Sequence, residues 1–528
     1  MKSSYVDLII ITTYFVGIMF IGIWAGRKES NLNDFALGGR RIPWWAVLAS
    51  IIAAETSAAT FLGAPAEGYR TQNILYVQLT LGTILARILI AWLFIKPYYH
   101  YNVYTVYEFL EIRFGKTTRT IGSFIFLLTR VLASGVRVYI ASVILVVVWK
   151  YLTGFSPTFT QYVVSILILT GVTAIYTMIG GIKAVIWTDL IQAVIMFCGA
   201  IVALLTILVL IPGGWEGIKL GTSNFAHFKV FDTGMNESGD LCSALLGVFK
   251  QEYTIWAALF GATFLTLATH GTDQDMVQRM LTASTYKQSR ISLMLSGIAD
   301  IPIALTFLLI GIFLFAFFRV SPDPQLPAAT NEIFAYFIIN YIPKGIRGLI
   351  IAGVFASAMG SLSAALNALA TSAVKDFYIP YLKRDGSESH YVLVARILTA
   401  LFSIFLILVA IIASYQVLHH PEKTIIPMAF GIIGYTYGPL LGIFLIGMLT
   451  RTRGHNLGNI IAMSLGFITV LVLSGTANTL LGYLNLPLIP CPHMAFTWYI
   501  LFGSVVTFLV GILFRSNLKL KKIKDADS

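Results

Sequence analysis

Thirteen long apolar runs dominate this sequence. They lie near residues 6–26, 44–69, 72–95, 120–150, 159–179, 186–212, 252–270, 289–317, 346–373, 391–415, 425–449, 457–476 and 494–514. A helix that crosses the hydrocarbon core of a bilayer needs about 20 apolar residues, which each run supplies. Only 11% of the residues are charged, against roughly 25% in soluble domains. The sequence therefore predicts an all-α integral membrane protein with about 13 transmembrane helices, and it excludes a soluble multidomain protein.

Basic residues between the runs predict how the chain is oriented. Of the 36 lysines and arginines, 21 fall in one alternating set of loops that includes the tail from residue 515. Cytoplasmic loops carry the excess of basic residues, so we expect a multi-pass protein of the cell (inner) membrane, with its N-terminus outside and its C-terminus cytoplasmic. The longest loop, about 213–250, should face outward. The formal net charge of +12 fits this topology better than nucleic-acid binding.

Motifs of several other function classes are missing from the sequence. There is no GxxxxGK phosphate loop, HExxH motif or CxxC pair, so an ATP-driven motor, a metalloprotease and a zinc centre have no support. No nucleophile–base set suggests an enzyme, and no cofactor or obligatory protein partner is predicted. Three cysteines exclude a disulfide scaffold. Cys242 and Cys491 both fall on the expected outer side, where they are either free thiols or a bonded pair.

Polar side chains inside the runs need a reason, because a charge in hydrocarbon costs about 3 kcal/mol on insertion scales. Glu55 lies mid-span among alanines, either as a paired structural glutamate or as a charge beside a cation or substrate path. Ser357 and Ser361 share a helix face, where they either offer oxygens to a hard cation or allow close helix packing. Asp189 is either a helix cap or an ion-path residue.

Six further charged side chains lie in or beside the runs, and the sequence does not settle their pairing. They are Arg130, Arg137, Asp273, Asp275, Arg279 and Asp300. Arg279 could pair with Asp273 or Asp275, and the stretch from Asp273 to Arg279 is expected to be a solvated loop.

Seven short motifs, in this order and spacing across the runs, resemble the sodium:solute symporter family. They are Gly38-Gly-Arg-Arg-Ile-Pro-Trp-Trp45, Thr60-Phe-Leu-Gly-Ala-Pro65, Tyr176-Thr-Met-Ile-Gly-Gly181, Trp187-Thr-Asp189, Asp273-Gln-Asp-Met-Val-Gln-Arg279, Ser361-Leu-Ser-Ala-Ala-Leu-Asn367 and Gly438-Pro-Leu-Leu-Gly442. The resemblance covers roughly residues 6–450.

The resemblance implies the leucine-transporter type of fold, in which two inverted five-helix repeats build the core. The first helix of each repeat should be broken at the midplane. The boundaries that follow are an extra helix and cytoplasmic loop over 1–43, repeats over 44–212 and 251–450, an outer loop over 213–250, and two extra helices with a basic tail over 451–528.

The resemblance also implies a main sodium site between the first and eighth core helices. Its ligands would be backbone carbonyls of Ala53, Thr56 and Ser357 and two hydroxyl positions, which here are Gly360 and Ser361. This chain therefore keeps one of the two hydroxyls. Glu55 is a candidate to supply the negative electrostatic field that the missing hydroxyl would contribute at the sodium ion. A second sodium site would involve Asp189, Gly360, Ser363 and Ala364, of which two lack a side-chain oxygen. Sodium is the only metal expected.

Four polar residues match substrate-site positions of the family. They are Thr60, Gln78, Thr266 and Thr269. The sugar-transporting relatives place an aromatic inner gate at the position of Thr269, so this chain departs from them there.

The predicted function is sodium-coupled import of a small polar organic solute by alternating access. One sodium ion that moves down 100 mV and a tenfold gradient supplies about 3.7 kcal/mol. For a monoanion the voltage contribution cancels and accumulation falls to about tenfold, so a neutral or zwitterionic solute is favoured at this stage. The alternatives are a membrane solute sensor with a separate signalling partner, and a proton-coupled symporter in which Glu55 titrates.

Overall fold

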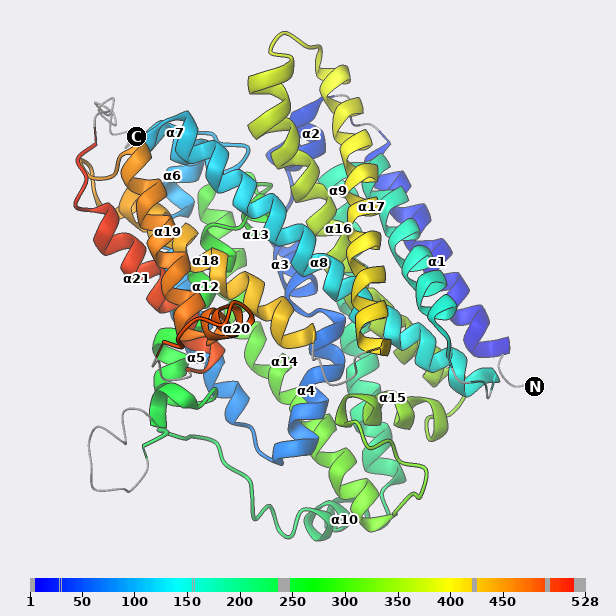
Figure 1. Cartoon of the computed structure of the whole chain (residues 1–528). Helices are drawn as coiled ribbons and strands as arrows, with labels where there is room; N and C mark the ends of the chain where they lie inside the picture. Colours follow the sequence, from blue (N-terminus) through cyan, green and yellow to red (C-terminus); the bar gives the residue numbers. More distant parts are fainter. Residues whose placement is uncertain are drawn as a thin grey trace.

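The computed structural model describes residues 5–27, 29, 31–153, 155, 157–235, 247–419, 425–489 and 494–516. Over these residues the chain is helical, and its β-type pairings are two isolated bridges, Ile42–Ala283 and Arg453–Arg515. Long helices pack side by side, and short helices lie at both ends of the bundle (Figure 1). The prediction of an all-α protein is confirmed. Cys242, Cys491 and the basic tail from residue 517 lie outside the described residues.

The helices follow the predicted apolar runs closely. Their bounds are α1 Tyr5–Gly26, α2 Leu32–Leu37, η1 Gly38–Arg40, α3 Trp44–Glu55, α4 Ala58–Thr71, η2 Leu75–Gln78, α5 Leu79–Leu93, α6 Ile95–His100, α7 Val106–Phe114, α8 Lys116–Thr153, α9 Phe159–Leu210, α10 Gly214–Gly221, η3 Ala257–Ala262, α12 Thr263–Gly271, α13 Gln274–Met280, α14 Tyr286–Val320, α15 Thr330–Asn340, α16 Ile346–Ser372, η4 Ala373–Leu382, α17 Glu388–His419, α18 Ile425–Leu449, α19 Asn456–Leu473, α20 Thr476–Tyr483, η5 Phe496–Trp498 and α21 Tyr499–Gly511.

Eight of the described helices are long and apolar enough to cross a membrane, or nine if the bent pair α3–α4 is one span. Three shorter apolar helices, over Ala257–Gly271, Ile433–Leu449 and Phe496–Gly511, also coincide with predicted runs. The exact number of thirteen spans stays a prediction. Helix α9 covers two predicted runs, and no separate loop divides them. The change of direction between the two runs occurs at one residue, Gly181, where φ is 51° and ψ is −148°. A Cβ at Gly181 would lie 2.6 Å from the carbonyl oxygen of Phe35, so only glycine fits this turn.

The break expected in the first core helix is present. Helix α3 ends at Glu55 and α4 begins at Ala58, and the two are bent by 58°. Thr56 has ψ 80° and Ser57 has ψ 169°, so both residues leave the helical region. Irregular backbone at membrane depth is tolerated only where protein or a water-filled cavity satisfies its polar groups. The break therefore marks a place where main-chain oxygens are available to other groups.

In the second half, the corresponding helix is continuous from η3 through α12, which ends at Gly271. The chain leaves the helical conformation at Thr272 and Asp273, where Asp273 has ψ 123°, and α13 begins at Gln274. A π-helical turn over Ala257–Ala262 is a further irregularity of this segment. Contact with α5 stabilises this segment, because the hydroxyl of Thr263 donates to the carbonyl oxygen of Gly82 at 3.2 Å.

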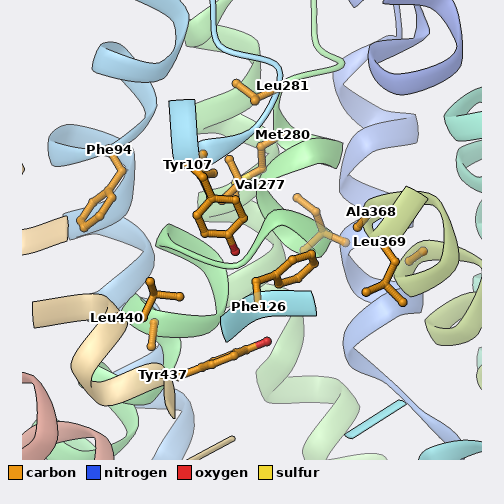
Figure 2. Close-up of a cluster of buried hydrophobic side chains, with 14 of the residues drawn as sticks. Phe94, Tyr107, Phe126, Val277, Met280, Leu281, Ala368, Leu369, Tyr437 and Leu440 are labelled. Carbon is orange, nitrogen blue, oxygen red and sulfur yellow. The ribbon is translucent and has the colours of Figure 1, made fainter. Parts of the chain in front are cut away.

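A large apolar core closes the end of the bundle where α7 and α13 lie. In Figure 2, Tyr107 of α7 and Phe126 of α8 point toward Val277 and Met280 of α13, with Tyr437 of α18 beside them. All five side chains are almost completely buried. The short helix α13 therefore sits inside the bundle and is not a solvated loop.

Helix α16 is anchored at its first turn by a residue of α1. Asp7 accepts hydrogen bonds from the backbone N–H groups of Gly345 and Gly348 at 2.8 and 3.0 Å, and it pairs with Arg347. A carboxylate is favoured at a helix N-terminus, where unpaired N–H groups and the helix dipole attract negative charge. The first helix of the chain thus caps a helix of the core.

Candidate functional site

Helix α16 lies directly against the break between α3 and α4. The hydroxyl of Ser357 donates to the carbonyl oxygen of Thr56 at 2.5 Å. One turn along α16, a Cβ placed on Gly360 would be 3.4 Å from the carbonyl oxygen of Ala53. The residues predicted for the main sodium site on α3 and α16 are therefore brought together, with all of their oxygens in the protein interior.

Ser361 faces a narrow cavity beside this junction. Its hydroxyl donates to the carbonyl oxygen of Ala358 at 3.0 Å. The polar residues that line the cavity are Ser57, Ser134, Arg137 and Ser361, and Ala58, Val138, Ala141, Leu169, Ala358 and Leu362 complete the wall. Within the described residues, the guanidinium of Arg137 makes no hydrogen bond or ion pair. A cation at membrane depth thus faces a cavity at the helix break.

Asp189 of α9 lies on the other side of Gly360 and is completely buried. Its Oδ2 accepts hydrogen bonds from Ser50 Oγ at 2.6 Å and from Arg279 at 3.0 Å. The same guanidinium lies 3.5 Å from the carbonyl oxygen of Gly360, which also accepts a bond from Ser363 Oγ at 3.1 Å. Two residues predicted for a second sodium site, Asp189 and Ser363, therefore come together, and the side chain of Arg279 reaches the same place.

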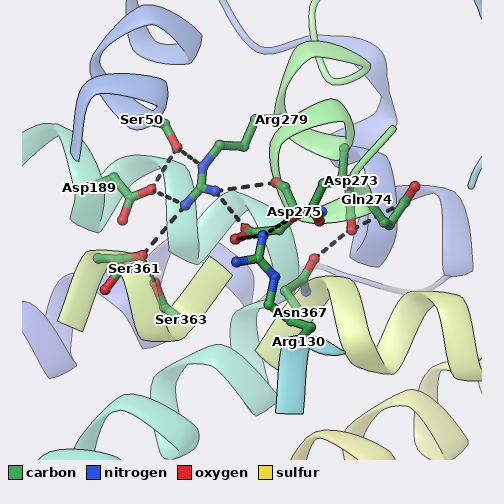
Figure 3. A network of polar contacts seen from close by, with 12 residues as sticks. Ser50, Arg130, Asp189, Asp273, Gln274, Asp275, Arg279, Ser361, Ser363 and Asn367 are labelled. Carbon is green, nitrogen blue, oxygen red and sulfur yellow. Dashed lines mark hydrogen bonds and ion pairs between the residues drawn. The ribbon is translucent and has the colours of Figure 1, made fainter. Parts of the chain in front are cut away.

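Arg279 belongs to a buried ionic network that joins α13 to the rest of the bundle (Figure 3). Arg279 pairs with Asp275 at 2.9 Å, and Asp275 pairs with Arg130 of α8 at 2.8 Å. Arg130 also pairs with Asp273, which accepts a 2.6 Å hydrogen bond from Tyr437 of α18. The Asp273–Arg279 motif is thus a set of interior ion pairs, which corrects the expectation of a solvated loop.

A second ionic cluster surrounds Glu55 at the end of α3. Arg87 of α5 pairs with both Glu55 and Asp300 of α14, and His270 of α12 contacts the same Glu55 oxygen. Arg87 and His270 are buried. The guanidinium of Arg87 therefore balances the charge of Glu55. Of the two alternatives for Glu55, this arrangement is that of a paired structural glutamate.

The four predicted substrate residues do not line the cavity. Gln78 bonds the segment between α10 and η3 instead, through the backbone N–H of Asp232 at 3.2 Å and the carbonyl oxygen of Tyr253 at 3.4 Å. Thr269 bonds the carbonyl oxygen of Leu265 in its own helix and the ring of His270. Thr60 is half-buried on α4 and Thr266 is buried on α12.

Sequence reasoning did not single out several of the polar groups that meet at the junction. Ser57, Ser134 and Gln192 carry no charge and stand inside apolar runs, where a serine or glutamine is a weak signal. The spacing of Asp189 and Gln192, three residues apart on one helix, does place both on the face that meets α16. That spacing was the signal available for Gln192.

Comparison with known proteins decides what kind of bundle this is. The profile of the sodium:solute symporter family matches residues 35–466. The chain belongs to this family. It is a multi-pass membrane transporter and not an enzyme. This symporter is 26% identical to the sodium/sialic acid symporter NanT of Aliivibrio fischeri, over 98% of this chain and 95% of that protein. It is 28% identical to the human sodium/iodide cotransporter, over 81% of this chain and 63% of that longer protein.

A solved structure supports the same fold. A Na⁺-coupled sialic acid symporter in a substrate-bound, outward-open state aligns with a TM-score of 0.81 at 24% identity, covering 98% of this symporter and 99% of that chain. The leucine-transporter type of architecture is confirmed. The domain boundaries proposed from the sequence stay a prediction.

Proposed function

We propose that this symporter imports a small organic solute that carries a carboxylate, driven by sodium. The observation that carries this proposal is Arg137, which lines the cavity beside the helix break and makes no hydrogen bond or ion pair with the described residues. A cation inside a transmembrane segment is expensive and normally pairs with another group. A bound anion would supply that pair.

The other polar residues of the cavity suit the same ligand. Ser57, Ser134 and Ser361 offer hydroxyl donors around Arg137. Guanidinium groups bind carboxylates through two parallel hydrogen bonds, and hydroxyl donors satisfy the remaining lone pairs. Ser57 is also the residue at which the broken helix resumes. A ligand bound here would therefore contact a segment whose main-chain geometry differs from that of a regular helix.

The charge of the solutes named for the relatives agrees with this assignment. Sialic acid and iodide, named in the two relatives above, are anions at neutral pH. The expectation of a neutral or zwitterionic solute rested on coupling energetics alone, and the unpaired Arg137 outweighs it. We therefore favour a monoanionic organic acid over a neutral sugar.

Sodium would bind where α16 meets the break between α3 and α4. The supporting observation is the convergence of Ala53, Thr56 and Ser357, with Ser361 one turn further along α16. Sodium at this junction would hold two helices together, so its binding would favour the solute-ready state and would couple the two ligands thermodynamically. Glu55 is already balanced by Arg87, which favours sodium over a proton at Glu55 as the coupling ion.

The membrane is proposed to be the cell membrane, with the N-terminus outside. The predicted basic loops 27–43 and 96–119, in which α2, α6 and α7 fall, lie at the end of the bundle opposite α10 and α15 (Figure 1). Under the positive-inside rule this supports that end as the cytoplasmic one.

The experiment that tests this function is uptake into proteoliposomes. A panel of labelled carboxylic acids is compared with their amides and with neutral sugars, with and without an inward sodium gradient. We expect sodium-dependent uptake of an acid and none of its amide. Uptake of a neutral sugar, but of no acid, would contradict the proposal.

The variants Arg137→Gln and Arg137→Lys sharpen this test. Gln removes the charge, so solute affinity should fall at least tenfold, while Lys keeps the charge and should retain part of it. The matched control is Arg70→Gln, since Arg70 lies on the exposed side of α4 and pairs with Glu67. Equal solute affinity in Arg137→Gln and wild type would remove Arg137 from the solute site.

A further inference from the structure

Arg290, near the start of α14, is held in place by contacts with two helices. Its Nε donates to the carbonyl oxygen of Ala91 in α5 at 2.5 Å. Its Cζ lies 4.8 Å from the ring centroid of Trp92 and 4.9 Å from that of Tyr286, so one aromatic ring from each helix contacts the guanidinium. Aromatic faces attract a cation. The position of the guanidinium is therefore fixed by the protein itself.

The terminal nitrogens of Arg290 are available to a ligand. Within the part of the chain that the structure describes, Nε is the only nitrogen of this side chain that makes a hydrogen bond, and the side chain forms no ion pair. The residue is partly exposed. A guanidinium binds a phosphate through two parallel N–H···O bonds. Arg290 thus offers a preorganised donor pair of the kind that a phosphate accepts.

Two exposed lysines extend the positive charge around Arg290. Lys287 precedes Arg290 by three residues on α14, and Lys96 follows Trp92 by four residues where α5 continues into α6. Residues three or four apart are neighbours on a helix surface. Neither lysine makes a hydrogen bond or ion pair with the described residues. Three cations from two helices therefore lie on one surface.

No acidic residue belongs to either segment of this surface. Residues 92–100 and 281–299 contain no aspartate or glutamate. The two segments are held together, because the hydroxyl of Tyr99 donates to the carbonyl oxygen of Ala283 at 2.9 Å. Like charges on neighbouring segments repel each other. An anionic ligand would relieve that repulsion.

Both helices expose a stripe of large apolar side chains next to the basic surface. The members are Leu81, Leu85 and Ile88 on α5 and Ile291, Leu295 and Ile298 on α14. On α5 this stripe is followed by Trp92, which is 67% exposed, and then by Lys96. A bilayer has the same order, from the acyl chains through the interface, where tryptophan and tyrosine are enriched, to the headgroups. The surface therefore suits a lipid better than a dissolved anion.

We propose that this surface binds an anionic phospholipid, with the phosphate on Arg290, Lys96 and Lys287 around the headgroup, and the acyl chains along the apolar stripe. The surface lies where α5 continues into α6, at the end of the bundle that Figure 1 shows opposite α10 and α15. Anionic lipids give the cytoplasmic leaflet its negative surface potential. The inference rests on the proposed membrane orientation and involves neither the solute nor sodium.

Lipid binding to the detergent-purified protein tests the site. Native mass spectrometry measures the dissociation constants of phosphatidylglycerol and of zwitterionic phosphatidylcholine with the same acyl chains. We expect phosphatidylglycerol to bind at least tenfold more tightly and to raise the melting temperature, as a ligand of the folded state does. Equal dissociation constants for the two lipids would overturn the proposal. The measurement uses no sodium or solute, so its outcome is independent of the proposed transport function.

Inorganic phosphate separates a lipid from a dissolved anion. The free ion lacks acyl chains, so at the same concentration it should neither raise the melting temperature nor displace phosphatidylglycerol. Displacement by inorganic phosphate as effective as by the lipid itself would show a site for a free anion and would overturn the lipid assignment.

The double variant Lys96→Gln/Lys287→Gln tests the headgroup contacts. Both lysines are exposed, so the variant should fold as wild type does. A cation near an anionic lipid surface is worth about fivefold in affinity, so phosphatidylglycerol should bind at least tenfold more weakly. The matched control is Lys229→Gln/Lys344→Gln, which removes two exposed lysines after α10 and α15. An equal loss in both double variants would indicate general charge attraction and would contradict the site.

Arg290 is tested by Arg290→Gln and Arg290→Lys. Gln removes the charge and should weaken phosphatidylglycerol binding at least tenfold, while Lys keeps the charge but loses the planar donor pair and should fall in between. The melting temperature without lipid checks that both variants fold, because both lose the bond to Ala91. Wild-type lipid affinity in Arg290→Gln would overturn the assignment. Conversion of a dimer to a monomer by the double lysine variant, with lipid binding unchanged, would instead show an interface between two copies of the chain and would also overturn it.

Discussion

The hydroxyl of Ser357 donates a 2.5 Å hydrogen bond to the carbonyl oxygen of Thr56 across the α3–α4 break. Thr56 is the residue at which α3 stops, so its carbonyl has no partner within that helix. The bond therefore satisfies a main-chain oxygen that the break would otherwise leave unpaired in the interior. It also fixes α16 in register with the broken helix.

Ser357→Ala should destabilise the folded protein. The variant leaves the Thr56 carbonyl oxygen buried and unpaired, which costs about 1–3 kcal/mol. Thermal unfolding of the purified protein without sodium measures the loss. Ser403→Ala on α17 is the control, because the Ser403 hydroxyl bonds only a carbonyl of its own helix, and a similar loss in both variants would contradict the role of the Ser357–Thr56 bond.

Ser361→Ala should lower the affinity for sodium more than the amount of protein in the membrane. Ser361 is the side-chain hydroxyl that this symporter keeps at the two family positions, and it donates to the carbonyl oxygen of Ala358 in its own helix. The sodium concentration for half-maximal uptake measures the effect. Ser414→Ala, which removes another intrahelical hydroxyl, should leave that concentration unchanged.

Uptake of a monoanion with one sodium ion should be electrically silent. The two charges cancel, so membrane voltage contributes nothing and a tenfold sodium gradient supports about tenfold accumulation. Accumulation in vesicles is compared with and without a potassium–valinomycin potential. Strong dependence on voltage would require a second cation per solute and would contradict coupling of one sodium ion to one monoanion.

Arg87→Met should be strongly destabilising. It leaves Glu55 and Asp300 without their shared guanidinium, and breaking a buried ion pair by removing one partner costs about 3–5 kcal/mol. Arg70→Met removes the exposed pair with Glu67, which is worth about 0.2–1 kcal/mol. Equal melting temperatures for the two variants would show that the Glu55 cluster is not structural.

Glu29 makes the stability of the segment between α1 and α2 depend on pH. Burial raises the pKa of this carboxyl to about 9 from its ordinary value of 4.5, with Lys183 opposing the shift. Between those two values the folded chain holds the proton and the unfolded chain releases it, so stability is highest below pH 4.5 and falls as the pH rises toward 9. At pH 7 the loss is up to about 3 kcal/mol.

Glu29→Gln keeps the neutral form at every pH. We expect this variant to melt at a higher temperature than wild type at pH 7–8 and to lose part of the decline between pH 5 and 9. Glu216→Gln is the control, since Glu216 is exposed on α10 and pairs with Lys219. An unchanged pH profile in Glu29→Gln would contradict the raised pKa.

Helix positions were predictable because the bilayer and the helix impose lengths that an apolar run displays directly. Local backbone departures were less so. The turn at Gly181 needs a glycine, yet Gly180 stands next to it and gives the same signal. The π-helical turn over Ala257–Ala262 leaves no mark in composition, since alanine, leucine and glycine also form ordinary helices.

The sodium positions on α3 and α16 were reachable from sequence through the family motifs, but the partners of the charged residues were not. Arg87 pairs with Asp300, 213 residues away, and Arg130 reaches Asp273 across 143 residues. Such pairings depend on how helices pack, which no local pattern encodes. Arg137 was visible as a charge in a run, and only the packed bundle shows that no described residue forms an ion pair with it.

The hydrogen bonds and the ion pair of Asp7 couple the position of α1 to that of α16. Asp7 of α1 holds the first turn of α16 through two backbone amides and Arg347. A tilt of α16 during alternating access therefore either moves α1 with it or breaks these bonds. A chain trimmed to begin at α2 would thus free the first turn of α16, the helix that bears Ser357 and Ser361. We therefore expect α1 to move together with α16 during transport, rather than to act as a separate membrane anchor.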